Sequence, residues 1–148
     1  VAAVTSSGLD SYLYDRSPTT EWPTLGDLVD SGRRLVVFAE TASPPPAWYH
    51  DAREFIQDTD YHVSTVDALD CDRNRGDATA PLFLLNHWIQ REAPDRADAV
   101  EVNQRTAITN RALTCADQRG KLPNFIAVNF FTIGDVVGAV DELNGFED

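Results

Sequence analysis

The sequence has little basic charge and no long apolar run. Of its 148 residues, 12 are Lys or Arg and 24 are Asp or Glu, which gives a net charge of −12. A protein that binds nucleic acid needs a cluster of basic residues facing the phosphates, so this composition argues against that class of partner. No stretch approaches the roughly 18 apolar residues of a membrane-spanning helix, and we expect no transmembrane segment.

Local catalytic motifs are absent as well. The chain has no G-x-S-x-G, no P-loop and no G-x-G-x-x-G motif. Its three histidines, His50, His62 and His87, do not have the H-x-x-x-H or H-x-H spacing of a zinc site. The sequence therefore predicts no metal site and no activated nucleophile within a single short segment.

One polar loop partly resembles a calcium loop. Asp70, Asp72 and Asn74 occupy the first, third and fifth positions of a D-x-D-x-N pattern. An EF-hand requires Gly next and Glu at the twelfth position, where this chain has Arg75 and Pro81. The match to an EF-hand fails.

The chain lacks an initiator Met and a signal-peptide pattern at VAAVTSSGLD, so its first residue looks like a processed or trimmed end. The two cysteines, Cys71 and Cys115, lie in polar surroundings, which favours a disulfide between them. It would close a loop of about 45 residues and stabilise the fold by roughly 4 kcal/mol. A disulfide indicates a secreted or extracytoplasmic protein. Two free thiols in a cytosolic protein are the alternative.

The apolar pattern predicts alternating helices and strands. We expect a lead-in loop over residues 1–21 and βα units over 22–148. The predicted strands cover 33–40, 61–64, 82–88 and 125–131, and the predicted helices cover 25–31, 47–57, 97–118 and 134–144. The segment TASPPP is expected to be irregular. Strands that are apolar on both faces belong to parallel sheets covered by helices.

The fold class is therefore α/β. Four such strands make half of a (β/α)₈ TIM-type barrel, which needs about 250 residues when complete. We expect residues 1–148 to form a single domain or half-barrel.

Ligands of parallel α/β folds meet the carboxyl ends of the strands, which gives the candidate site residues. For supporting catalytic roles they are Glu40 and Asn129, and for substrate binding they are Asn86, His87, Trp88 and Phe131. Each has a structural alternative. His87 could be a packed histidine bonded to a backbone carbonyl, Asn129 could bond a neighbouring strand, and Glu40 could be a solvated acid. Trp88 and Phe131 could be core residues.

Four segments together resemble a known family: WPTLGDLVDSGRRLVVFAE, CDRNRG, LFLLNHW and PNFIAVNFFTIGDVVGAVDELNG. In this order they are similar to the phosphatidylinositol-specific phospholipase C-like phosphodiesterases, and more narrowly to the secreted bacterial and fungal members. The resemblance runs from about Trp22 to Gly145 and covers the second half of that TIM barrel.

The resemblance implies phosphodiester cleavage by one histidine as general base and a second as general acid. Both histidines belong to the first half of the barrel, so they would have to lie on another polypeptide segment. The second half supplies residues that line the site and an Asp that orients a catalytic histidine. Asn129 stands at that position here. An amide can hold an imidazole but cannot stabilise its charged form. In serine proteases the comparable change from Asp to Asn lowers kcat by a factor of about 10⁴.

The resemblance leaves the cofactor unknown, with calcium as a possibility that it alone suggests. The expected partners are the N-terminal half of the barrel or a second copy of the chain, and the expected substrate is a phosphodiester or phospholipid. The alternative function is a non-catalytic binding or interaction module derived from the same barrel.

Overall fold

The computed structural model describes residues 2–16, 21–40 and 46–146. The chain divides into two compact units, Val1–Phe55 and Ile56–Asp148. Each unit has its own small parallel sheet.

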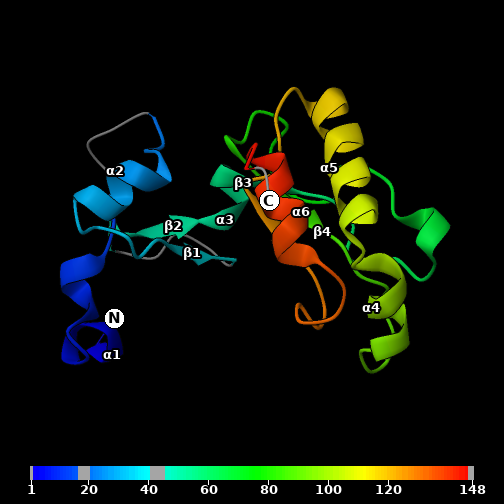
Figure 1. Cartoon of the computed structure of the whole chain (residues 1–148). Coiled ribbons are helices and arrows are strands. Elements are labelled where there is room, and N and C mark those ends of the chain that lie inside the picture. The colour runs from blue at the N-terminus through cyan, green and yellow to red at the C-terminus, as the bar shows by residue number, and fades with distance from the viewer. Residues whose placement is uncertain (1, 17–20, 41–45, 147–148) are drawn as a thin grey trace. The chain divides into compact units, whose positions relative to one another are not determined.

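The described residues of the first unit form four helical segments and two strands, most of which are labelled in Figure 1. In chain order these are α1 (Ala2–Ser6), the 3₁₀ helix η1 (Leu9–Tyr12), α2 (Leu25–Asp30), β1 (Val37–Ala39), β2 (Tyr49–Asp51) and α3 (Ala52–Phe55). Strands β1 and β2 pair in parallel, with Phe38 opposite His50.

Helix α2 begins with a capping box formed by Thr24 and Asp27. The Asp27 backbone N–H donates to Thr24 Oγ1 at 3.1 Å, and the Thr24 backbone N–H donates to Asp27 Oδ2 at 3.0 Å. Two backbone donors that the first turn would leave without partners are thereby satisfied. Gly32 follows the helix with a φ of 71°, so the chain leaves α2 in a conformation that favours glycine.

Aromatic rings surround a buried histidine in the first unit. His50 is 4% exposed. Its ring lies 5.4 Å from the Trp22 ring and 5.9 Å from those of Phe38 and Phe55, measured between centroids. Burial lowers the pKa of His50, because the imidazolium form would lose its hydration among these rings.

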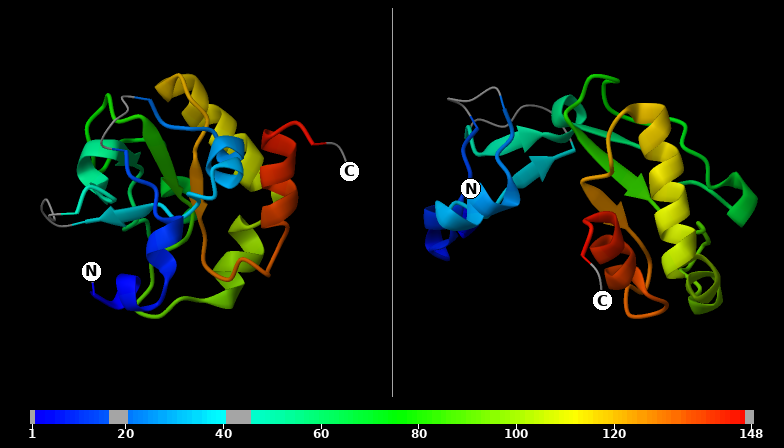
Figure 2. Two further views of the ribbon diagram at one scale, coloured as in Figure 1. Left: turned by 90° about the vertical axis from the view of Figure 1, so that its left-hand side faces the viewer. Right: turned by 45° about the horizontal axis from the view of Figure 1, so that its top comes forward.

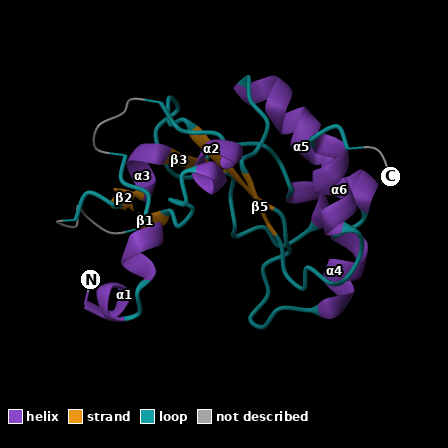
Figure 3. Cartoon of the chain, turned by 60° about the vertical axis from the view of Figure 1, so that its left-hand side comes forward, coloured by secondary structure: helices purple, strands orange, loops and turns teal. Residues whose placement is uncertain are grey.

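The second unit holds a three-stranded parallel sheet in the order β3-β4-β5. Its elements are β3 (Ile56–Asp58), the 3₁₀ helix η2 (Val66–Ala68), β4 (Leu82–Asn86), α4 (Arg96–Val102), α5 (Arg105–Arg119), β5 (Phe125–Ala127) and α6 (Val136–Leu143). Helices α5 and α6 pack on each other and lie together beside the sheet (Figures 2 and 3). The β4–α4–α5–β5 connection is the crossover that parallel strands require.

Alternate residues of β4 form the core beneath α5. Phe83 and Leu85 are fully buried and pack with Ala112 of α5. The same cluster includes Cys71 and Cys115, which form the disulfide expected from the sequence. This bond joins the loop that follows η2 to the centre of α5. None of the described helices is long and apolar enough to cross a membrane.

Several expected elements differ in the structure. The predicted lead-in loop contains α1 and η1, and the predicted helix 47–57 is instead β2, the single turn α3 and β3. The prediction failed there because strand pairing outweighs local helix preference: β2 pairs with β1, and β3 pairs with β4. The predicted strand 61–64 is not a strand, and its Val63 packs with Ile89 and Val102. Most of TASPPP lies outside the described residues.

The predicted helix 97–118 is two helices, α4 and α5, which break at Asn103 and Gln104. The break occurs where the buried Asn103 side chain donates from Nδ2 to the Asn129 carbonyl oxygen at 2.8 Å, a contact between segments far apart in the sequence. The strands predicted at 33–40, 82–88 and 125–131 are present but shorter. The α/β class with parallel strands is confirmed, and the half-barrel stays a prediction.

Candidate functional site

A partly buried ion pair lies at the carboxyl end of β3. Asp58, the last residue of β3, is 2% exposed. Arg75 donates to its carboxylate from the backbone N–H at 2.8 Å, from Nε at 2.8 Å and from Nη2 at 2.6 Å. The Arg75 guanidinium also lies 4.6 Å from the Tyr61 ring centroid, where the cation and the ring attract each other. The Asp58 carboxylate is therefore held in one orientation by three donors from the same residue.

Asn86 ends β4 beside this ion pair. Its Nδ2 donates to the Thr59 carbonyl oxygen at 2.7 Å and lies 3.4 Å from Asp58 Oδ2. We call Asp58, Thr59, Arg75 and Asn86 the strand-end cluster. The cluster unites carboxylate, guanidinium and amide groups at the sheet edge where parallel α/β folds place their ligands.

His87 points the other way, toward α4 and α5. Its Nε2 lies 2.8 Å from the Val102 carbonyl oxygen, and its Nδ1 lies 3.1 Å from Arg111 Nη1. A carbonyl oxygen only accepts and a guanidinium only donates, so the proton of the neutral ring is on Nε2 and Nδ1 is the acceptor. Burial, with the nearby Arg111 charge, lowers the pKa of His87 to about 4. Such a ring stays neutral at physiological pH, with both nitrogens occupied.

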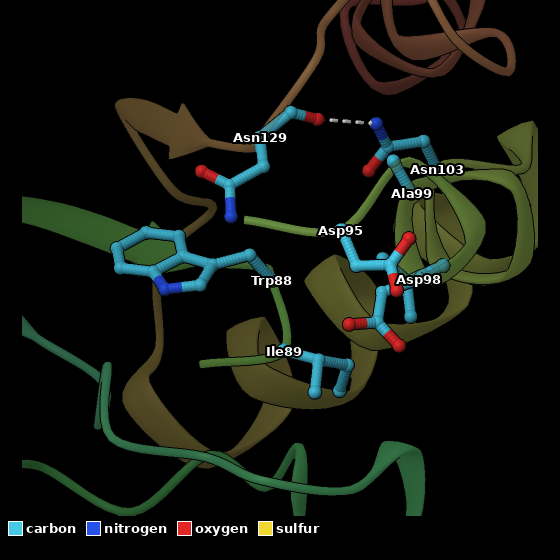
Figure 4. A pocket seen from close by; sticks show the side chains of 8 residues that line it. Trp88, Ile89, Asp95, Asp98, Ala99, Asn103 and Asn129 are labelled. Atoms are coloured by element: carbon cyan, nitrogen blue, oxygen red, sulfur yellow. Dashed lines mark hydrogen bonds between the residues drawn. The ribbon is translucent and has the colours of Figure 1, made fainter. Parts of the chain in front are cut away.

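Trp88 and Asn129 line a small pocket (Figure 4). Its other lining residues come from the segment after β4 and from α4 and its ends: Ile89, Asp95, Asp98, Ala99, Val102 and Asn103. The two carboxylates already have partners. Asp95 accepts from the Ala97 backbone N–H at 2.8 Å, and Asp98 accepts from Arg91 Nε and Nη2, each at 2.8 Å. This ion pair with Arg91 lowers the pKa of Asp98.

The turn after β5 is held by Asn103. Asn103 Nδ2 donates to the Asn129 carbonyl oxygen, drawn as a dashed line in Figure 4. Phe130 follows with a φ of 52°, which is uncommon for a bulky residue. Gly134 has a φ of 80°, and a Cβ placed there would collide with the Asn103 carbonyl oxygen. The Asp135 backbone N–H donates to that same oxygen at 2.9 Å. Asn103 therefore fixes the backbone on both sides of the turn.

The structure brings some of the expected site residues together and separates others. Trp88 and Asn129 share the pocket of Figure 4, and Asn86 belongs to the strand-end cluster. Phe131 lies beyond β5 with its side chain on the surface, at 68% exposure. Glu40 follows β1 in the first unit and is exposed. The functional roles assigned to these residues, and to His87, stay predictions.

Three structurally important polar residues escaped the sequence analysis: Asp58, Asn103 and Arg111. Asp58 lay just after a segment predicted to be helical, so its place at a strand end was hidden. Arg111 gave a usable signal, because it falls on the same helical face as the buried Ile108 and Cys115. A charged residue in such a stripe indicates a buried arginine with partners.

No metal site is formed by the described residues: no group of three or more His, Cys, Asp or Glu side chains is placed to hold an ion. The calcium suggested by the family resemblance therefore finds no ready ligand set in the described part of the chain.

Comparison with known proteins gives a family match over nearly the whole chain. The family model PI-PLC X 1 matches residues 1–144. A PI-PLC X domain-containing protein of the fungus Arthroderma benhamiae is 28% identical over 138 residues, which cover 84% of this chain and 45% of that protein. An uncharacterised secreted protein of the same fungus is 25% identical, with 96% of this chain and 37% of that protein covered.

A PI-PLC X domain-containing protein of Arabidopsis thaliana is also similar, at 25% identity over 95% of this chain and 35% of its own length. The chain thus spans less than half the length of the curated relatives that it matches. No solved structure matches significantly.

Proposed function

Since the chain belongs to the PI-PLC X domain family, we propose that it forms the C-terminal half of the barrel of a secreted phospholipase C-like phosphodiesterase. In this proposal the two proton-transfer histidines lie on the N-terminal half. The chain supplies residues at the carboxyl ends of the later strands, which line the site.

The observation that carries the proposal is the state of His87. Both ring nitrogens are occupied and the pKa is about 4, whereas a general acid or base works best with a pKa near the operating pH. His50 is buried among aromatic rings and its pKa is also lowered, while the His62 side chain is 66% exposed and lies beside Asp60. Neither His87 nor His50 is a poised proton-transfer group, which supports a division of the site between two halves.

The strand-end cluster then has a positioning role. The Asp58–Arg75 ion pair, with Asn86 beside it, fixes the ends of β3 and β4, from which the neighbouring residues face a phosphodiester or its alcohol group. Asn129 stands at the family position of an Asp that orients a catalytic histidine. Its amide can hold an imidazole in place by a hydrogen bond but adds no charge stabilisation.

Secretion is part of the same proposal. The disulfide Cys71–Cys115 is of a kind that persists in oxidising compartments. One similar fungal protein is described as secreted. Both observations support an extracytoplasmic location.

The test is the turnover of a chromogenic phosphodiester and of an inositol phospholipid by this chain. We expect none by the 148-residue chain, and turnover when a polypeptide carrying the N-terminal half of the barrel is added or joined to it. In the active combination, Asn129→Asp should raise kcat. The increase in kcat should be largest if the side chain contacts the catalytic imidazole. Its upper limit is the factor of about 10⁴ by which the reverse substitution, Asp to Asn, lowers kcat in serine proteases.

Two results would contradict the proposal. The first is turnover by this chain without the other half that is lost in His87→Ala or His50→Ala. The second is failure of the joined halves to act on either substrate although they form a folded complex; this second result would favour the non-catalytic binding module. Native and denaturing mass measurements on purified material show whether a second, unlike chain accompanies this one.

A further inference from the structure

The second unit has a cleft that the proposed reaction does not use. It measures about 410 Å³, within the size range of small-molecule sites. It is lined by the η2 segment and by helices α4 and α5, which follow one another end to end in Figure 1. We call it the helix-side cleft, and its lining residues are Val66, Leu69, Asp70, Cys71, His87, Glu101, Val102, Ala107, Asn110, Arg111, Thr114 and Gln118. No residue of the strand-end cluster lines it.

The wall formed by residues 66–71 is anchored at its end. The disulfide joins Cys71 to Cys115 of α5. Arg111 Nη2 donates to the Asp70 carbonyl oxygen at 2.7 Å, and Arg119 Nη2 donates to the Cys71 carbonyl oxygen at 2.7 Å. A wall held by a covalent bond and two charged donors is already ordered before a ligand binds, which reduces the entropic cost of binding.

The two basic side chains that line the cleft, Arg111 and His87, have no free N–H group to offer an anion. Arg111 donates from Nη1 to the Asn86 carbonyl oxygen at 2.7 Å and to His87 Nδ1 at 3.1 Å. Its Nε and Nη2 donate to the Asp70 carbonyl oxygen at 3.2 and 2.7 Å, and Nη2 also reaches Thr59 Oγ1 at 3.5 Å. These contacts use all five N–H groups of the guanidinium. The Nε2–H of His87 is likewise taken by Val102.

The remaining lining combines apolar side chains and acidic groups with three neutral polar residues, Asn110, Thr114 and Gln118. Val66, Leu69, Val102 and Ala107 provide hydrocarbon, and Val66 keeps 41% of its surface exposed over the cleft. Glu101 is exposed and has no ion-pair partner among the described residues, and Asp70 adds a second carboxylate. The chain as a whole carries a net charge of −12, which attracts cations over a longer range.

From this arrangement we propose that the helix-side cleft binds a small amphiphilic amine. Its hydrocarbon body packs against Val66, Leu69 and Ala107, and its ammonium group lies at Glu101. The proposal does not depend on the phosphodiesterase function, because the cleft and the strand-end cluster use different side chains.

The experiment uses three probes of equal chain length: n-hexylammonium, n-hexanol and hexanoate. Binding to the oxidised full chain is measured by isothermal titration calorimetry and by ligand-observed NMR. We expect hexylammonium to bind with a roughly millimolar dissociation constant, as its few heavy atoms allow. Hexanol should bind more weakly, and hexanoate should not bind detectably.

Substitutions inside and outside the helix-side cleft test where hexylammonium binds. Ala107→Trp fills the cleft and should abolish hexylammonium binding. Leu113→Trp is the control: it adds the same side chain to α5 outside the cleft, at a residue that is 49% exposed. This control should leave hexylammonium binding unchanged. Glu101→Gln should weaken hexylammonium binding by about two- to fivefold, the range of an exposed ion pair, with no effect on hexanol. Glu142→Gln removes the same charge from α6 as its control.

The circular dichroism of each variant is compared with that of the parent chain. If Ala107→Trp does not fold, Asn110→Trp fills the cleft from an exposed position on the same helix face. The proposal is overturned if hexanoate binds as tightly as hexylammonium, if the cleft-filling variant still binds, or if no probe binds at saturating concentration. Equal losses in Glu101→Gln and Glu142→Gln would also overturn it.

Discussion

The buried, neutral His87 makes the stability of the second unit depend on pH. Its pKa falls from 6.5 to about 4 in the folded chain because burial opposes the imidazolium form. The unfolded chain therefore binds a proton at a higher pH than the folded chain does. By linkage, the His87 contribution is fully present above pH 6.5 and is lost as the pH falls toward 4.

The size of the effect follows from the shift. Each pKa unit corresponds to 1.36 kcal/mol, so the full loss is about 3 kcal/mol. Between pH 7 and pH 5 the free energy of unfolding should fall by about 2 kcal/mol from this residue. That is a large share of the 5–15 kcal/mol typical of a folded domain.

The assay is urea unfolding followed by tryptophan fluorescence at several pH values from 7.5 to 4.5. His87→Gln removes the titrating ring. It should lower stability at pH 7, because the contacts with Val102 and Arg111 change, and it should flatten the pH dependence by about 2 kcal/mol between pH 7 and 5. His62→Gln is the matched control, since that side chain is 66% exposed, and it should keep the parent slope.

Other titrating groups cancel in this comparison. Burial also lowers the pKa of His50, but His50 is present in both proteins and drops out of the difference. The carboxylates whose pKa values are lowered by hydrogen bonds, such as Asp98, cancel in the same way. Equal pH slopes for the parent chain and His87→Gln would refute the reasoning.

Three further predictions concern stability. Reducing the disulfide, whose cysteines are 44 positions apart, should cost roughly 4 kcal/mol of unfolding free energy, measured by urea unfolding with and without reductant; an unchanged midpoint would contradict this. Gly134→Ala should lower the free energy of unfolding by about 3 kcal/mol, because its Cβ would meet the Asn103 carbonyl oxygen. Gly120→Ala should lower it by only about 1 kcal/mol, because Gly120 has a φ of 68° but a Cβ there would meet no other atom. Equal losses in the two alanine variants would show that the close approach does not matter. Arg75→Met should lower the free energy of unfolding by about 3 kcal/mol, because Asp58 stays buried without its charge partner. The double variant Arg75→Met/Asp58→Asn should recover part of that loss in the same assay. If it recovers nothing, the ion pair is not the cause of the loss.

The strongest sequence signals were local ones, and they held. The apolar spacing at 25–31 located α2, and the apolar runs at 82–88 and 125–131 located β4 and β5. Apolar runs indicate burial on both faces, which is a property of the segment itself. The ends of these strands were less well predicted because a strand ends where its pairing partner ends.

The segments with weak local preference were decided by distant partners. Residues 47–57 read as helical, but β2 and β3 form there because β1 and β4 pair with them. The helix predicted at 97–118 breaks at Asn103 because its side chain reaches Asn129, which lies 26 positions away. Such contacts produce no periodic pattern of apolar and polar residues, so they cannot be detected from a single sequence.

By itself the sequence determined that this chain is an acidic α/β protein with parallel strands, and it named the family to which the chain belongs. Only the tertiary structure decided which polar groups meet: Asp58 with Arg75, and His87 with Val102 and Arg111. The physical reason is the range of the interactions. Periodicity and capping depend on neighbours within a few residues, whereas the pKa and the partners of a buried side chain depend on segments that folding brings together.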